Sequence, residues 1–202
     1  MRQLNYFLLF LLTAVMGCRQ SGMESYRSLV KKELNSNKKV SDIFFGISLG
    51  MTGKEFYAHC WEMNKKGIFT DGSNNAAVLY KLDNRELQHP AQMNFYPEFH
   101  NGKIHKMWAR FQYMGWMPWN KKLGSDSLLT DVLRLYKKWY KEGNSFITIP
   151  DEKKGNIYVK VDGNRRIIIG RYDDVEVKAD YTDLLVEQQM KKENSIKQNS
   201  NP

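Results

Sequence analysis

The sequence lacks most of the features by which enzymes and membrane-spanning proteins are recognised. It contains no phosphate-binding loop, no zincin motif and no dinucleotide-binding motif. Its longest nearly apolar run, residues 4–15, is shorter than the about 20 residues that a membrane-spanning helix needs. Only two of the 202 residues are cysteines, so the hydrophobic residues, 42% of the chain, must supply the stability of the fold.

The first 17 residues are typical of a secretory signal peptide. A short cationic start, Met1-Arg2, precedes the apolar run, and the small residue Gly17 stands directly before Cys18. The stretch Val15-Met16-Gly17-Cys18 resembles the lipobox of bacterial lipoproteins. That resemblance implies that Cys18 becomes the first residue of the mature chain and carries the lipid, which leaves Cys60 without a disulfide partner. The alternative is an ordinary cleaved signal followed by an incidental cysteine.

The chain is basic, with a formal net charge of +9. A basic chain can bind nucleic acid, but export argues against that partner, and most lysines stand in doublets at the ends of predicted elements. A solvated surface explains them; attraction to anionic lipid head groups is the alternative. Residues 19–22 lack the acidic run that marks surface export in some lipoproteins. We therefore expect a lipid-anchored protein of the outer membrane that faces the periplasm.

Composition divides the remaining chain into three parts. Residues 18–41 are polar and lysine-rich and are expected to form a tether, in which Tyr26, Leu29, Val30 and Leu34 have the spacing of a short amphipathic helix. Residues 191–202 show no apolar periodicity and are expected to be a disordered tail. Between them, residues 42–190 form one domain of two similar halves, 42–120 and 121–190.

The first half begins with a short apolar segment, Phe44 to Leu49. Thr52 and Glu55 then form a capping box that opens a helix running to about Lys66. Three strands follow, and Asn101-Gly102 predicts a tight hairpin between the last two. These strands are predicted over Ala76–Leu82, Gln92–Phe99 and Lys103–Tyr113.

The second half repeats the order of the first. A helix opens at Gly124-Ser125-Asp126 and ends at Gly143, and its apolar residues form one broad stripe. Four strands and a final helix to about Lys192 follow. The strands are predicted over residues 146–149, 156–161, 165–172 and 175–181. Helices followed by antiparallel meanders, twice, predict an α+β fold in which helices pack on one face of an antiparallel sheet.

This layout resembles a family of small envelope lipoproteins. An exported chain in which Gly50-Met51-Thr52-x-x-Glu55-Phe56 opens a helix, followed by a meander, a second helix and a second meander, resembles the BamE (SmpA/OmlA) and β-lactamase-inhibitor-protein-like class. The resemblance implies a non-enzymatic module that binds other proteins through an open sheet face. The Leu-Gly-Pro ending typical of the BamE-type helix is absent after Met63.

Residues 46–50, Gly-Ile-Ser-Leu-Gly, match the G-x-S-x-G pattern of serine hydrolases and make Ser48 a candidate nucleophile. The expected context is missing, because hairpins rather than βα units follow and no histidine occurs after His105. Phe45, Ile47 and Leu49 alternate with smaller residues, as in a half-buried strand. A strand leading into a helix is therefore the preferred interpretation, and Ser48 hydrolase chemistry is the alternative.

The remaining reactive side chains give weaker signals. Cys60 beside His59 lies on the apolar face of its predicted helix, which favours an inert core thiol. His100 and His105 flank a turn without a third ligand at a recognisable spacing, so the sequence predicts no metal site and no cofactor.

A stretch rich in tryptophan supplies the binding hypothesis. Trp116 and Trp119 lie in the loop that joins the two halves and either plug the core or form an exposed aromatic platform. Trp108 and Arg110 are expected on the wet face of the strand before it. We expect a membrane-anchored, non-enzymatic protein that binds another protein or an envelope component through this open sheet face. A carbohydrate-binding lipoprotein that uses its exposed tryptophans is the second hypothesis.

Overall fold

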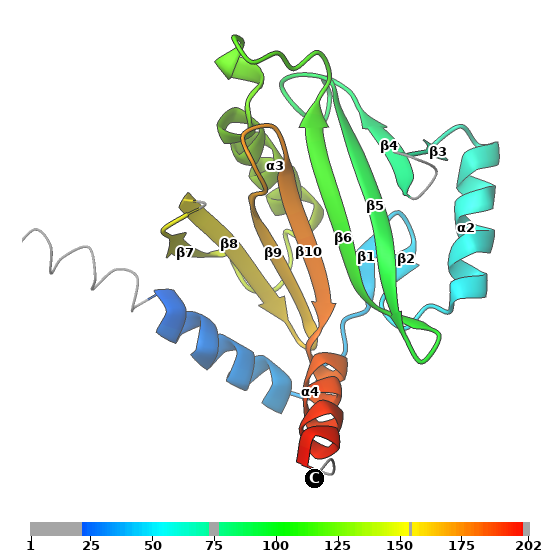
Figure 1. Cartoon of the computed structure of the whole chain (residues 1–202), viewed down its shortest axis with the longest axis vertical. Helices are drawn as coiled ribbons and strands as arrows, with labels where there is room; N and C mark the ends of the chain where they lie inside the picture. Colours follow the sequence, from blue (N-terminus) through cyan, green and yellow to red (C-terminus); the bar gives the residue numbers. More distant parts are fainter. Residues whose placement is uncertain (1–21, 73–76, 154, 200–202) are drawn as a thin grey trace, which may run out of the picture.

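The computed structural model describes residues 22–72, 77–153 and 155–199. The predicted α+β class is confirmed: an antiparallel sheet of eight strands and a separate two-stranded hairpin combine with helices (Figure 1). The signal segment and Cys18 lie outside the described residues.

The first half of the chain contributes a hairpin, a helix and four strands. Its elements are β1 (Asp42–Phe44), β2 (Ile47–Ser48), α2 (Gly53–Lys65), β3 (Phe69–Asp71), β4 (Val78–Leu82), β5 (Ala91–His100) and β6 (Lys103–Tyr113).

The second half repeats a helix and four strands. Its elements are η2 (Lys121–Leu123), α3 (Ser125–Trp139), β7 (Ile147–Asp151), β8 (Gly155–Asp162), β9 (Arg165–Arg171), β10 (Val177–Asp183) and α4 (Leu184–Asn199). The strand order β3-β4-β5-β6-β10-β9-β8-β7 places the two meanders side by side, joined through β6 and β10.

Local sequence signals account for several of these boundaries. Thr52 caps α2 with its side chain, and the Glu55 carboxylate accepts from the Thr52 backbone N–H at 2.8 Å, so the predicted capping box is present. Asn101 and Gly102 take left-handed φ angles of 49° and 73° between the paired residues His100 and Lys103. A two-residue turn of that kind matches the twist of the strands that it joins.

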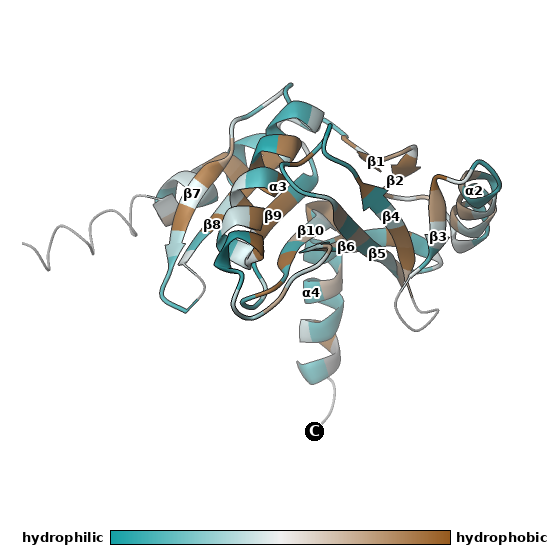
Figure 2. Ribbon diagram, turned by 90° about the horizontal axis from the view of Figure 1, so that it is seen from above, coloured by the Kyte–Doolittle hydropathy of each residue, from teal (hydrophilic) through white to brown (hydrophobic). Residues whose placement is uncertain are grey.

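The main core lies between the sheet and α3. Side chains that alternate along β5, β6, β9 and β10 form this core. The helix α3 and the β1–β2 hairpin lie over this side of the sheet (Figure 2). Aromatic rings fill much of the space, and Tyr136 of α3 lies 5.9 Å from Phe111 of β6, ring centre to ring centre. The fully buried side chains include Phe56, Met93, Phe95, Met107, Phe111, Leu128, Tyr136, Ile167 and Tyr181.

A second, smaller core lies on the opposite face of β7 to β9. Residues 22–35, which the sequence analysis assigned to a tether, form a helix that packs there. The Tyr26 hydroxyl and the Arg166 guanidinium are 3.0 Å apart, and Glu33 accepts a hydrogen bond from the Gly163 backbone N–H at 2.7 Å. The folded part therefore begins at residue 22 and not at residue 42, because the apolar stripe of this helix finds a partner in the sheet.

The C-terminal prediction also needs correction. The stretch from Lys191 was expected to be disordered, but α4 continues to Asn199. Side-chain contacts one turn apart accompany the extension: Gln189 donates to Glu193 at 2.8 Å, and Lys191 lies 3.5 Å from Glu187. Pairs at this spacing stabilise a helix without burying an apolar face.

The apolar segment from Phe44 to Leu49 is a hairpin rather than one strand. Phe45 and Gly46 form its two-residue turn with φ angles of 50° and 82°, and Phe44 pairs with Ile47. The short strand β3 was not predicted at all. Both deviations involve segments of two or three residues, which are too short to show a period in sequence.

Candidate binding surface

Alternate residues of β5, β6 and β10 face away from α3 and form a mixed polar and aromatic surface, which we call the open face. Figure 1 looks at these strands with α3 and the β1–β2 hairpin behind them. The strand register places Tyr96 opposite Trp108, and Trp108 opposite Asp180. The open face includes Gln92, Lys106, Trp108, Arg110, Gln112, Lys178 and Asp180, all of them half-buried. Tyr96 is covered by α2, where its hydroxyl lies 2.6 Å from that of Tyr57.

Trp108 and Arg110, the two residues predicted to be on the wet side of β6, are in contact. The Arg110 guanidinium carbon lies 5.9 Å from the centre of the Trp108 ring and 3.6 Å from that of Tyr172. Glu176 holds the guanidinium from the side, with 3.1 Å between Nη1 and Oε2. A cation held over aromatic rings is favourable by about 0.5–1 kcal/mol at exposed sites, so these contacts help to hold the Arg110 side chain in place.

The turn between β9 and β10 supplies Tyr172 and Glu176. One oxygen of Asp173 accepts the backbone N–H groups of Val175 at 2.8 Å and Glu176 at 2.7 Å. Asp commonly shapes turns in this way. The sequence analysis did not include Tyr172 or Glu176 in the site, because only the β6–β10 pairing brings this turn beside Arg110.

The two tryptophans of the connecting loop differ in exposure. Trp119 is 79% exposed, so the hypothesis that both indoles plug the core is wrong for this residue, whereas Trp116 is half-buried. Trp108 stands five residues before the end of β6, which is about 17 Å along a strand. The structure therefore separates the loop tryptophans from the cluster at Trp108.

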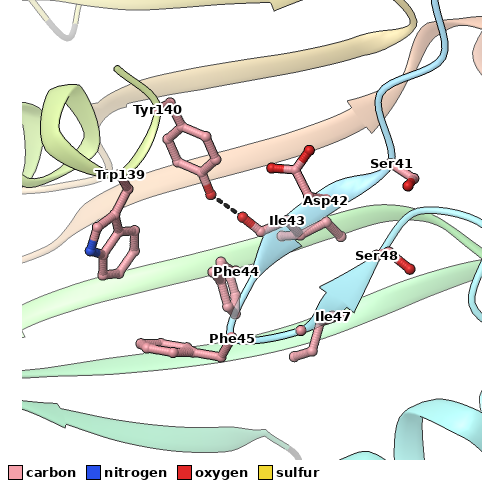
Figure 3. A pocket seen from close by; sticks show the side chains of 10 residues that line it. Ser41, Asp42, Ile43, Phe44, Phe45, Ile47, Ser48, Trp139 and Tyr140 are labelled. Atoms are coloured by element: carbon pink, nitrogen blue, oxygen red, sulfur yellow. Dashed lines mark hydrogen bonds between the residues drawn. The ribbon is translucent and has the colours of Figure 1, made fainter. Parts of the chain in front are cut away.

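A pocket of about 480 Å³ lies beside the β1–β2 hairpin (Figure 3). Four of its ten lining residues are aromatic, with Trp139 and Tyr140 from the end of α3 facing Phe44 and Phe45 of the hairpin. The Tyr140 hydroxyl donates to the Ile43 carbonyl oxygen and thereby fixes the hairpin to α3.

Ser48 belongs to the lining of this pocket, and its local structure differs from a nucleophile elbow. It lies in the second strand of a tight hairpin, on the side away from Trp139 and Tyr140 in Figure 3. No histidine is among the ten residues that line the pocket. Gly46 serves the hairpin turn, and Ser48 pairs with Asp42 of β1 rather than standing at a strand-to-helix turn.

His59 of α2 contacts the turn of the β1–β2 hairpin. Its Nε2 lies 2.7 Å from the Phe45 carbonyl oxygen and its ring lies against Gly46. A bulky residue at positive φ is uncommon and strained. The Phe45 ring also contacts Tyr80 and Trp139, with ring centres 4.4 Å and 5.6 Å away, so packing on both sides holds this conformation.

Burial shifts the pKa values of two other candidate side chains, Cys60 and His105, toward their uncharged forms. Burial raises the pKa of the half-buried Cys60 thiol to about 11, which keeps it protonated at neutral pH. The rings of His100 and His105 lie 5.8 Å apart, and burial lowers the pKa of His105. Within residues 22–72, 77–153 and 155–199, no group of three or more His, Cys, Asp or Glu side chains is placed to hold a metal ion.

No helix in the described part of the chain has the length and apolar character needed to cross a membrane. Comparison of the chain with protein-family models, with curated proteins and with solved structures found no match. The fold and the surface together define an α+β protein with an eight-stranded antiparallel sheet and a preorganised aromatic and cationic cluster on the open face.

Proposed function

We propose that this chain is a membrane-anchored, non-enzymatic lipoprotein of the cell envelope that binds another protein or an envelope component through its open face. The lipid would be carried by Cys18, as the lipobox resemblance implies, and the anchor would hold the domain on the periplasmic side of the outer membrane.

The contact of Arg110 with both Trp108 and Tyr172 is the observation that supports this proposal most strongly. Tryptophan, tyrosine and arginine dominate the energetically important positions of protein interfaces. Glu176 and the neighbouring strands hold these side chains, so a partner would find them already ordered. Less conformational freedom is then lost on binding, which favours affinity.

The charges around the cluster fit the same role. Lys178 lies 2.9 Å from Asp180, and Lys106 lies 3.6 Å from Glu98. Exposed pairs of this kind contribute about 0–1 kcal/mol to stability. These pairs place positive and negative groups alternately around Trp108. Such a pattern favours partners whose charges are complementary to it.

The experiment is a capture of envelope proteins by the full-length lipoprotein, followed by comparison of two double variants. Trp108→Ala with Arg110→Ala removes the cluster on the open face. Trp61→Ala with Lys65→Ala is the matched control, because Trp61 is an exposed tryptophan of α2 with a lysine ammonium 5.6 Å from its ring.

Loss of a captured partner in the first variant but not in the control is the expected result. A partner retained equally by both variants, or no partner above background for the unmodified protein, contradicts binding through the open face. Circular dichroism of both variants checks that each remains folded.

A carbohydrate ligand is the second candidate, favoured by the 79% exposure of Trp119 and by the planar amides of Gln92 and Gln112, which lie 3.4 Å apart on the open face. An aromatic ring can stack on a sugar, and amide groups can form hydrogen bonds with its hydroxyl groups. Titration of envelope polysaccharides against tryptophan fluorescence tests it, with Trp119→Phe and Trp108→Phe identifying the ring that responds. No fluorescence change at any glycan concentration removes this candidate.

A further inference from the structure

The distance between the proposed lipid site and the folded domain is short. Only residues 19–21 separate Cys18 from Gly22, the first residue of the packed N-terminal helix. Four residue steps of fully extended chain span at most about 14 Å. A lipid on Cys18 therefore cannot place Gly22 farther than that from the attachment point, whatever the conformation of the three residues.

The helix that begins at Gly22 is fixed to the sheet at both ends. At its start, a Cβ added to Gly22 would lie 2.8 Å from the Thr148 carbonyl oxygen, so the helix backbone packs directly on β7. At its end, Glu33 accepts from the Gly163 N–H, and shortly after it the Val40 N–H donates to the Asn164 side chain at 2.7 Å. The helix therefore acts as part of the rigid domain and not as a flexible spacer.

The position of Gly22 on β7 selects one edge of the sheet. β7 is the last strand of eight, and β3 lies seven strand spacings away, which corresponds to about 34 Å. Trp108 on β6 lies four spacings from β7, or about 19 Å. A link of at most about 14 Å keeps the β7 edge near the attachment point, whereas the β3 edge lies more than twice that distance away across the sheet.

The charge of the exposed side of the N-terminal helix fits the same orientation. Its exposed charged side chains are Arg27, Lys31 and Lys32 against the single acid Glu24. Basic side chains near a membrane are attracted to anionic head groups within about one Debye length, about 8 Å at physiological ionic strength. The short link keeps the start of this helix within about 14 Å of the attachment point, so its basic side chains can reach that range.

We infer that β7 and the exposed side of the helix of residues 22–35 lie against the surface of an anionic phospholipid bilayer, with Trp108 about 19 Å from that edge of the sheet. The inference rests on the lipidation of Cys18 in the proposed function. It adds an orientation: the open face would meet partners within or next to the same membrane rather than across the periplasm.

Fluorescence quenching in vesicles tests the orientation. The lipidated protein carries Cys60→Ser and one new labelled cysteine, either Ser25→Cys on the helix or Asp71→Cys on β3, both at exposed positions. The vesicles contain phosphatidylcholine, phosphatidylglycerol and a lipid with a spin label on its head group. The label at residue 25 is expected to be quenched several-fold more than the label at residue 71. Equal quenching, or stronger quenching at residue 71, overturns the inference.

A longer link separates the two causes of the orientation. Insertion of about a dozen Gly and Ser residues before Gly22 raises the root-mean-square span of the link to about 22 Å. The difference between the two labels should then shrink, and an unchanged difference would overturn the role of the short link. Mass measurement of the N-terminal peptide is the independent check: absence of lipid on Cys18 defeats the proposed anchoring, whereas lipid with equal quenching defeats only the orientation.

Discussion

The two faces of β5, β6 and β10 are built from alternate residues of the same strands, yet they meet different surroundings. Phe111 and Met107 of β6 are fully buried under α3 and the hairpin, while Arg110 and Trp108 between them remain half-exposed. The covered face is nearly all apolar and aromatic. The open face carries paired charges, amides and one indole.

The difference separates the residues that stabilise the fold from those to which we assign binding. Removing an aromatic side chain from water contributes stability roughly in proportion to the area buried, so the covered face supplies most of the folding energy. The open face contributes little to folding, and it carries Arg110, to which we assign a role in the proposed binding. Substitutions of neighbouring residues in one strand should therefore separate the two roles.

The largest effect is expected on the covered face. Phe111→Ala removes a fully buried ring that packs on Tyr136 and should lower the free energy of unfolding by about 3–5 kcal/mol. Gln112→Ala, the next residue on the opposite face, should change it by about 0.5 kcal/mol or less. Urea unfolding of both variants measures the contrast. Similar losses in the free energy of unfolding would contradict the different roles of the two faces.

A polar group under α3 should have the next largest effect. Asp131 is 1% exposed and accepts the Gln88 backbone N–H and the Tyr113 hydroxyl, each at 2.7 Å. Asp131→Ala leaves these donors without an acceptor, at a cost of about 1–3 kcal/mol for each buried group.

Asp126 of the same helix provides the control for that substitution. Its carboxylate is exposed and pairs with Arg171 at 2.8 Å, so Asp126→Ala should cost about 1 kcal/mol or less. Thermal unfolding compares the two variants. An equal fall in melting temperature would contradict the importance of the buried acceptor.

A pH-dependent effect on stability is expected from His105, near the start of β6. His105 is 5% exposed, and burial, followed by the charge of Lys106, lowers its pKa below the ordinary 6.5. The unfolded chain then binds a proton at a higher pH than the folded chain does. Stability should fall as the pH drops through the ordinary histidine value of 6.5, and it should be insensitive to this group well above that value.

His105→Leu tests the assignment. The variant should lose less stability than the unmodified protein between neutral and acid pH, as measured by urea unfolding at a series of pH values. An identical acid-side slope in both proteins would assign the loss to other groups, such as Glu98 and Asp183, which lie close enough to His105 to affect its pKa.

The smallest effect on stability is expected from the open face. Trp108→Ala removes a half-buried ring and one cation contact, so it should lower the free energy of unfolding by about 1 kcal/mol or less. The same variant should lose the envelope partner. A large loss of stability here would show that the face is part of the core after all.

The sequence predicted the longer helices and strands correctly because each is long enough to show a full period of apolar residues. The Thr52–Glu55 capping box, the Asn101-Gly102 turn and the strand from Lys103 to Tyr113 all stand where the sequence predicted them. Alternation along that strand also separated Trp108 and Arg110 from the covered face. These features depend on contacts within a few residues, which the order of side chains specifies directly.

The errors share a different cause. The helix of residues 22–35 looked like a tether because its apolar stripe gains a partner only when β8 and β9 form the surface that it covers. The sequence analysis expected one strand from Phe44 to Leu49, with Ser48 chemistry only as an alternative, because a local pattern does not show that Gly46 lies at the turn of a hairpin.

The sequence alone determined the α+β class, the long strands and the face on which Trp108 stands, since backbone preference and apolar periodicity act over short separations. Only the tertiary structure decided that Tyr172 and Glu176 meet Arg110 and that the N-terminal helix is packed on the sheet. The physical reason is that these contacts join segments far apart in the chain. Their existence depends on the antiparallel pairing of β6 with β10 and on the way that the two meanders meet.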